Sequence, residues 1–235
     1  LALRKLRDEV SCVMTQAGTA ANAHNLSPRF MEGIEALYGG TRLAEQELHG
    51  ALVEGAGALW KAEEIAQARC ERPEKLDRVV VAIDPPAGMD GSACGIVVAG
   101  RVGKRGYVLA DRSASGLRPL AWAKRAVEAA EEFGAVRIVA EANQGGEMVR
   151  DTLQTAGVKC RVDLVHASRS KRARAEPVSA LYQQGKVHHC GVFRELEEEL
   201  MAMGVGDKET GLDRADALVW AMWALKLTQN VAPLP

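Results

Sequence analysis

The sequence contains no closely spaced pair of cysteines. Its five cysteines, at positions 12, 70, 94, 160 and 190, are dispersed and odd in number, and no C-x-x-C pair occurs. This usage argues against a disulfide framework and against a cysteine-based zinc site. We therefore expect free, mostly buried thiols and a reducing, cytoplasmic location.

The chain also has neither a long apolar run nor an excess of one charge. No stretch of about 18 apolar residues occurs, and the opening LALRKLRDEV lacks the apolar segment of a signal peptide. No association with a membrane is expected. The 30 Lys and Arg residues nearly balance the 31 Asp and Glu residues. Binding to nucleic acid would therefore depend on local clusters of basic residues.

The phosphate-binding motif of many ATPases is missing as well. No GxxxxGK[ST] pattern occurs, and the glycine turn AGMDGSACG resembles a phosphate-binding loop only loosely. The first residue is not Met. We therefore expect a fragment of a longer protein, with a further domain upstream.

The chain changes character near residues 70–78. Residues 26–68 are predicted to form helices broken by glycine, with Ser27-Pro28 as a start and Gly39-Gly40 as a stop. The polar stretch CERPEKLDR then indicates a boundary. From residue 78 onward, runs rich in β-branched residues alternate with helical patterns. We therefore predict a small helical part at residues 1–70 and an α/β domain at residues 71–235.

The α/β domain is predicted to contain a mixed five-stranded sheet with helices on both faces. The first three strands are joined by short glycine-bearing turns, which indicates antiparallel neighbours, and the last two follow helical crossovers. In this topology the first and fourth strands are adjacent. The strands are expected at residues 79–83, 95–99, 107–110, 136–140 and 161–165, and the helices at residues 120–133, 145–156, 171–184, 192–203 and 212–227.

Three widely separated acids lie at element ends that this topology brings together. Asp84 and Glu141 each follow an apolar strand, at the edge where open α/β sheets bind ligands. Asp216 lies about one turn into the last predicted helix, whose dipole helps to hold an anion. Crowded carboxylates repel one another unless cations neutralise them. Because no His or Cys lies beside them, they favour Mg²⁺ or Mn²⁺ over zinc.

Some of these acids also have structural interpretations. Asp84 precedes two prolines and could simply be a turn residue, whereas a Glu at the end of an apolar strand has no role in a turn. Asp213 lies three residues before Asp216, on the same helical face. It could cap the helix, as Thr210 and Gly211 also could, or serve as a fourth carboxylate for a second, weaker metal ion. Both roles of Asp213 are open.

A basic cluster opens the helix predicted at residues 171–184. It could be a solvated helix face or a surface that binds DNA phosphates beside the acids. The acidic stretch ELEEEL at residues 195–200 shows that charge is separated between neighbouring helices, which favours DNA binding. The cluster consists of Arg169, Lys171, Arg172 and Arg174.

Two other groups of residues are expected to be structural. His188 and His189 have no further His or Cys at zinc-ligand spacing, so a short exposed strand is the default interpretation. The tryptophans are expected to be core or interface anchors, and their spacing does not suggest stacking with bases. They are Trp60, Trp122, Trp220 and Trp223.

Five motifs follow one another in an order typical of a known family. They are VVVAIDPP, GIVVAG, VAEANQGGEMV, SKRARAEPVSALYQQGKVHH and LDRADALVWAMWAL. With them, nearly all of residues 78–227 resembles the C-terminal nuclease domain of the terminase large subunit, the DNA-packaging motor protein of tailed bacteriophages and gene transfer agents. The resemblance implies an RNase H-like fold and a two-metal endonuclease that cuts concatemeric double-stranded DNA. By motif match, Asp84, Glu141 and Asp216 would be the metal-binding acids.

The resemblance also implies partners. Residues 22–60 are similar to the end of the family's ATPase domain and its connector, so residues 1–70 would be a remnant of these parts. In the full-length protein, an N-terminal ATPase domain, a portal and a small terminase subunit would act together with the nuclease in the cytoplasm of a bacterial host. This chain lacks the nucleotide-binding motifs, so no motor activity is expected from it alone.

Three other functions are compatible with the same residues. One is another RNase H-like nuclease, such as a Holliday-junction resolvase or a transposase-type domain, which would prefer branched DNA. Another is an actin-like or sugar-kinase-like domain, in which an Asp and a glycine turn hold a phosphate and ATP would bind. The third is a catalytically idle docking module, whose activities would survive replacement of the three acids.

Overall fold

The structure is a computed structural model that describes residues 19, 24–39, 41, 58–86, 93–143, 146–204 and 211–228. The chain divides into two compact units, residues 1–56 and residues 57–235. In the first unit the structure describes helix α2 (Pro28–Tyr38), which begins directly after Ser27 as the sequence predicts. Most of the stretch that resembles the ATPase connector lies outside the described residues.

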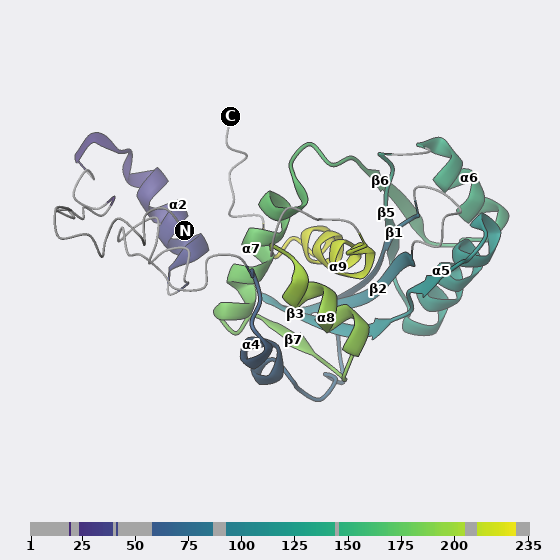
Figure 1. Cartoon of the computed structure of the whole chain (residues 1–235), viewed down its shortest axis with the longest axis horizontal. Helices are drawn as coiled ribbons and strands as arrows, with labels where there is room; N and C mark the ends of the chain where they lie inside the picture. The colour runs from purple at the N-terminus through teal and green to yellow at the C-terminus, as the bar shows by residue number, and fades with distance from the viewer. Residues whose placement is uncertain are drawn as a thin grey trace, which may run out of the picture. The chain divides into compact units, whose positions relative to one another are not determined.

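A mixed seven-stranded sheet forms the centre of the second unit (Figure 1). The strand order is β6-β5-β1-β2-β3-β7, and the two-residue β4 pairs with β2. Strands β1, β2 and β3 are antiparallel neighbours, whereas β1–β5, β5–β6 and β3–β7 are parallel pairs. The strands are β1 (Arg78–Asp84), β2 (Ala93–Val102), β3 (Arg105–Asp111), β4 (Ala114–Ser115), β5 (Arg137–Glu141), β6 (Arg161–Val165) and β7 (Val187–His189).

All five predicted strands are present, and the predicted contact between the first and fourth of them is confirmed as the parallel pair β1–β5. The sheet has seven strands and not five because β4 and β7 also join it. These two strands have only two and three residues. Runs this short carry no measurable alternation of apolar and polar residues.

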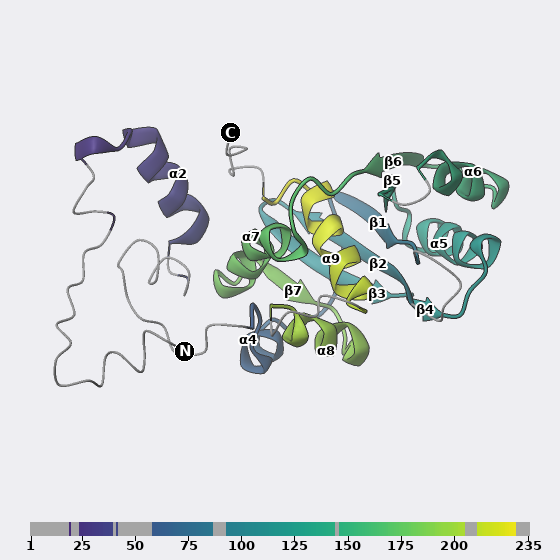
Figure 2. The ribbon, with the colours of Figure 1, turned by 45° about the horizontal axis from the view of Figure 1, so that its top comes forward.

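Helices cover both faces of the sheet (Figure 2). Successive residues of a strand point to opposite faces. Val80 and Ala82 of β1 accordingly pack with α7, α8 and α9, whereas Val81 and Ile83 pack with α5 and α6. No helix in the described part of the chain is long and apolar enough to span a membrane. The helices of this unit are α4 (Ala62–Gln67), α5 (Pro119–Phe133), α6 (Glu147–Thr155), α7 (Lys171–Gln183), α8 (Arg194–Ala202) and α9 (Asp213–Ala224).

The segment at residues 58–70 packs with the sheet unit. Trp60 is 1% exposed and contacts Tyr182 of α7 edge to face, with 5.9 Å between the ring centroids. The carbonyl of Leu59 accepts a hydrogen bond of 2.6 Å from Ser179 Oγ. The compact unit therefore begins before residue 71, although the interpretation of residues 1–70 as an ATPase remnant stays a prediction.

Strand β7 is buried, contrary to the exposed strand expected for the two histidines. His189 is completely buried, and β7 lies between β3 and the segment around Arg69. Its Nε2 is 2.7 Å from the hydroxyl of Tyr182, and its Nδ1 is 3.0 Å from a carboxylate oxygen of Glu197. These polar partners come from α7 and α8 and allow an imidazole to be buried.

Candidate metal centre

Asp84 and Glu141 lie side by side at the carboxyl edge of the sheet. The parallel register of β1 and β5 pairs Ile83 with Ala140. The next residue in each strand is one of the two predicted acids, so both carboxylates lie at the same edge. The structure therefore brings together the first two residues of the predicted set.

Helix α9 brings two more acids to this edge. Its first turn rests on Gly95 of β2, the residue that pairs with Asp84 across the two strands. Asp213 is the first residue of α9, and Asp216, which is completely buried, follows one turn later. All four acids named from the sequence are thus close together at one end of the sheet.

The charges of these acids affect one another. Burial raises the pKa of Asp84 well above its usual range, and the negative charges of Asp216 and Glu141 raise it further. Burial is also the main cause of the raised pKa of Asp213, to which Asp216 contributes. A cluster of this kind favours a bound cation.

Two of the four basic residues face the acids. Lys171 Nζ lies 2.5 Å from Asp216 Oδ2, and Arg174 bridges Asp216 Oδ1 at 2.9 Å and Glu141 Oε1 at 3.6 Å. The Arg174 side chain is only 6% exposed. Burial lowers the pKa of Lys171, but the carboxylate of Asp216 outweighs this effect, and the pKa is raised overall.

The other two basic residues lie outside the acid cluster. Arg172 is exposed and pairs with Glu176 at 3.1 Å, and Arg169 is half-buried just before α7. The sequence treated the four cations as one DNA-binding surface, whereas the structure places Lys171 and Arg174 among the acids. Contact with DNA stays a prediction for all four.

The donor set fits a hard divalent cation. The candidate ligands are all carboxylates, which Mg²⁺ and Mn²⁺ prefer, and Asp213 Oδ2 is buried without a hydrogen-bond partner in the described part of the structure. Within the same described ranges, no three His, Cys, Asp or Glu side chains are already grouped as a metal would require. Because Lys171 and Arg174 pair with the acids, metal binding requires some of these ion pairs to rearrange.

Residues that the sequence analysis did not assign to the site hold Glu141 in place. Trp220 Nε1 donates to Glu141 Oε2 at 2.6 Å, and Asn143 Nδ2 donates to Glu141 Oε1 at 2.6 Å. Trp220 was expected to be a core or interface anchor. Its spacing of four residues from Asp216 on one helix would have indicated that both face the same side.

The start of α9 is capped by a neighbouring helix. Glu199 Oε2 of α8 accepts from the backbone N–H groups of Arg214 at 2.8 Å and of Ala215 at 3.1 Å. Leu212 is the N-cap and supplies no side-chain hydrogen bond. Glu199 therefore performs the capping considered for Asp213, and Thr210, the other candidate, lies outside the described residues.

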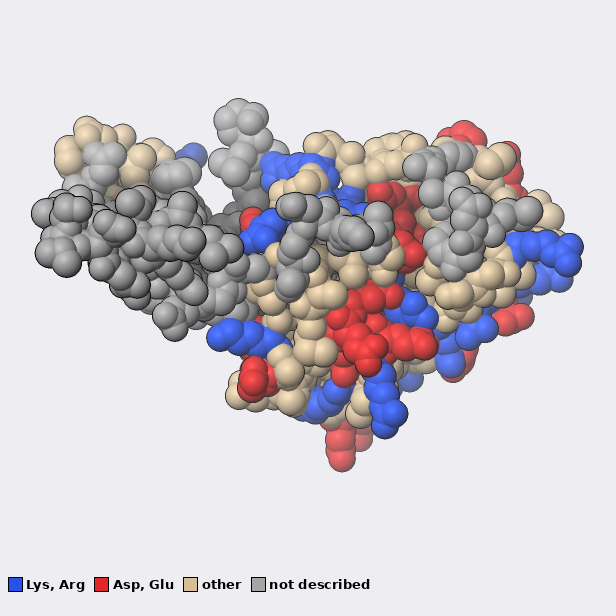
Figure 3. Space-filling view, viewed as in Figure 1, with Lys and Arg blue, Asp and Glu red and all other residues tan. Residues whose placement is uncertain are grey.

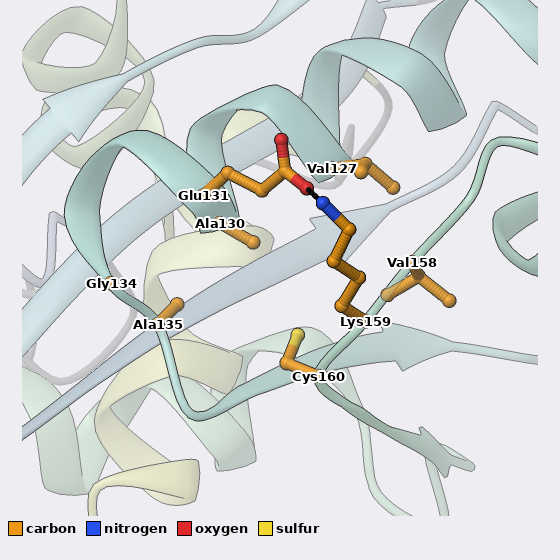
Figure 4. Close-up of a pocket in the computed structure, with 8 residues that line it drawn as sticks. All are labelled: Val127, Ala130, Glu131, Gly134, Ala135, Val158, Lys159 and Cys160. Atoms are coloured by element: carbon orange, nitrogen blue, oxygen red, sulfur yellow. Dashed lines mark ion pairs between the residues drawn. The ribbon is translucent and has the colours of Figure 1, made fainter.

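A surface pocket of about 260 Å³ lies away from this centre (Figure 4). Gly134 and Ala135 precede β5, and Cys160 precedes β6, so the pocket is at the amino ends of the strands that carry Glu141 and its neighbour. An ion pair of 2.7 Å between Lys159 and Glu131 borders it. The pocket is therefore separate from the acid cluster.

Comparison with known proteins gives one family. Residues 81–225 match the model of a family described as "Terminase RNaseH-like domain". No curated protein matches the chain.

Several solved structures share the fold. The human cytomegalovirus terminase nuclease domain, Mn soaked and inhibitor bound, has a TM-score of 0.54 at 14% identity over 71% of this chain and 94% of that one. A full large terminase from a thermophilic bacteriophage has a TM-score of 0.61 at 13% identity over 87% of this chain. This chain spans only 53% of that phage protein. The large terminase nuclease of the thermophilic phage G20c has a TM-score of 0.50 at 15% identity, over 66% of this chain and 85% of that one.

These similarities agree with the architecture of the second unit. The family model covers β1 to α9 and so includes all four acids. The RNase H-like fold implied by the sequence motifs is confirmed. The chain belongs to the terminase RNaseH-like domain family.

Proposed function

We propose that this chain is the nuclease part of a terminase large subunit and cuts concatemeric double-stranded DNA during viral genome packaging. The observation that carries this proposal is the meeting of Asp84, Glu141, Asp213 and Asp216 at the carboxyl edge of an RNase H-like sheet. The Mn-soaked nuclease domain of human cytomegalovirus has the same fold, which supports the use of a divalent ion.

In this proposal Asp84, Glu141 and Asp216 hold Mg²⁺ or Mn²⁺, and Asp213 supports a second ion. When bound, the two ions lower the pKa of the attacking water and stabilise the charge on the leaving 3′ oxygen. Asp84 has Glu141 on one side and the start of α9 on the other. It is therefore the acid best placed to contact both ions.

Lys171 and Arg174 prepare this site electrostatically. Their positive charges offset the repulsion between the carboxylates of Asp216 and Glu141. Because Arg174 is buried, its charge acts on the acids and not on solvent.

The DNA backbone would approach over the start of α7. Figure 3 shows basic side chains in this region next to the acidic cluster, with a separate acidic surface over α8. Arg172 and Arg169 are the cations here that lie outside the acid cluster. Phosphate contacts position DNA without reading its bases, so we expect little sequence specificity. In the full-length protein, an ATPase domain, a portal and a small subunit would present the DNA in the host cytoplasm.

Cleavage of a supercoiled plasmid tests the proposal. The chain should cut it with Mg²⁺ or Mn²⁺, without ATP, and fail to do so in EDTA. Linear duplex and four-way junctions should be cut at similar rates. Exclusive cutting of junctions would instead indicate a resolvase. A thermal shift with ATP but none with Mn²⁺ would indicate a nucleotide-binding domain.

A further inference from the structure

The carboxylate of Glu141 is held at both of its oxygens by neutral donors. Trp220 Nε1 donates to Oε2 and Asn143 Nδ2 donates to Oε1, each at 2.6 Å. A carboxylate offers about four lone-pair positions. Two hydrogen bonds therefore fix the orientation of the group and leave positions for a cation.

The position of Trp220 depends on the same helix that carries Asp216. The two residues lie four apart on α9 and so on one helical face. The face of the Trp220 ring lies 4.7 Å from the guanidinium carbon of Arg174, which in turn contacts Asp216. One side chain thus contacts both Glu141 and the cation that links Glu141 to Asp216.

The amide of Asn143 is itself oriented by the backbone. Its Oδ1 accepts a hydrogen bond of 2.8 Å from the N–H of Ala167, in the segment between β6 and α7. This bond turns the amide so that its Nδ2 faces Glu141. The Glu141 carboxylate is therefore held from α9 on one side and from the end of β6 on the other.

We propose that Trp220 and Asn143 are positioning residues of the metal centre, which fix the Glu141 carboxylate relative to Asp216 and thereby set the affinity for the ion. The inference rests on the proposed function. Groups that orient a metal ligand through hydrogen bonds typically change metal affinity by about 10–100-fold when they are replaced. Trp220 and Asn143 act through Glu141, so the chemistry at saturating metal should change much less than the affinity.

The test uses Trp220→Phe, which keeps the aromatic ring and removes the donor, and Asn143→Ala. Trp122→Phe is the matched control, because Trp122 is buried in the core on the opposite face of the sheet. Mn²⁺ binding is measured by calorimetry without DNA, and cleavage is measured as a function of Mn²⁺ concentration. Both test variants should need about tenfold more Mn²⁺ for half-saturation in each experiment. The control should be unchanged.

Wild-type affinity in folded Trp220→Phe and Asn143→Ala would overturn the inference while leaving the proposed function intact. If Trp220→Phe does not fold, Asn143→Ala decides the question, since Asn143 is exposed. If the wild-type chain neither binds Mn²⁺ nor cuts DNA, the proposed function fails and the inference falls with it.

Discussion

The backbone of Asp213 packs directly against Gly95. A Cβ atom on Gly95 would lie 1.9 Å from the carbonyl oxygen of Asp213 and 3.1 Å from the Cβ of Ala217. Because Gly95 pairs with Asp84 across β1 and β2, this contact sets how closely the acids of α9 approach the acids of the sheet.

Gly95→Ala should therefore impair both stability and activity. The added methyl group must push α9 away from the sheet, and overpacking of this kind costs about 1–3 kcal/mol. Chemical denaturation and the cleavage rate in saturating Mn²⁺ measure the two effects. Gly100→Ala is the control in the same strand, because its Cβ would meet mainly methyl groups of Leu76, which can shift. Equal losses in the two variants would contradict the role of Gly95.

Asp84→Asn should raise the melting temperature of the protein in EDTA. A carboxyl whose pKa is raised on folding stabilises the fold below its unfolded pKa, and this contribution is lost as the pH rises through the folded pKa. The advantage of the variant should thus be absent near pH 4, grow as the pH rises through the raised pKa, and then stay constant. Melting curves at a series of pH values give this difference. A lower melting temperature for Asp84→Asn at neutral pH would argue against electrostatic strain at this residue.

Glu197→Gln should destabilise the fold at neutral pH by on the order of 2 kcal/mol. Burial alone would raise the pKa of Glu197, but hydrogen bonds from His189 and Arg69 lower it well below its usual range. Its contribution is therefore fully present above the unfolded pKa of about 4.3 and is lost as the pH falls through the folded pKa. Urea titrations at several pH values measure it, with the exposed neighbour Glu198→Gln as the control. A loss that is independent of pH would show that the charge of Glu197 is unimportant.

Neutralising Arg169 and Arg172 together should weaken DNA binding equally for all sequences. Two lost phosphate contacts should also reduce the slope of log affinity against log salt by about two. Fluorescence anisotropy at several salt concentrations measures both quantities. Replacing Lys104 and Arg105, in the turn between β2 and β3 at the opposite end of the sheet, is the control. If both double variants bind like the wild type, the start of α7 is only a solvated surface.

The sequence was sufficient to predict the main strands and the positions of the acids. Asp84 and Glu141 each end an apolar run, and the rules for crossover connections place the two strands side by side. The burial of His189 was not predictable, because its partners Tyr182 and Glu197 come from two separate helices.

Charge patterns also left the directions of side chains undetermined. The spacing of Lys171 and Arg174 gave a basic cluster but not the face of α7 that meets the acids. Trp220 was assigned only a packing role because an indole N–H has no sequence pattern that reveals its acceptor. Such contacts depend on how distant elements pack together.

The most direct test of the account is the rate at which Asp84→Asn, Glu141→Gln and Asp216→Asn cut a supercoiled plasmid in Mn²⁺ without ATP. The wild-type chain should cut the plasmid, and each variant, with an unchanged circular dichroism spectrum, should be slower by more than about a hundredfold. Cleavage at the wild-type rate by all three variants would contradict the conclusion that these carboxylates form a catalytic metal centre.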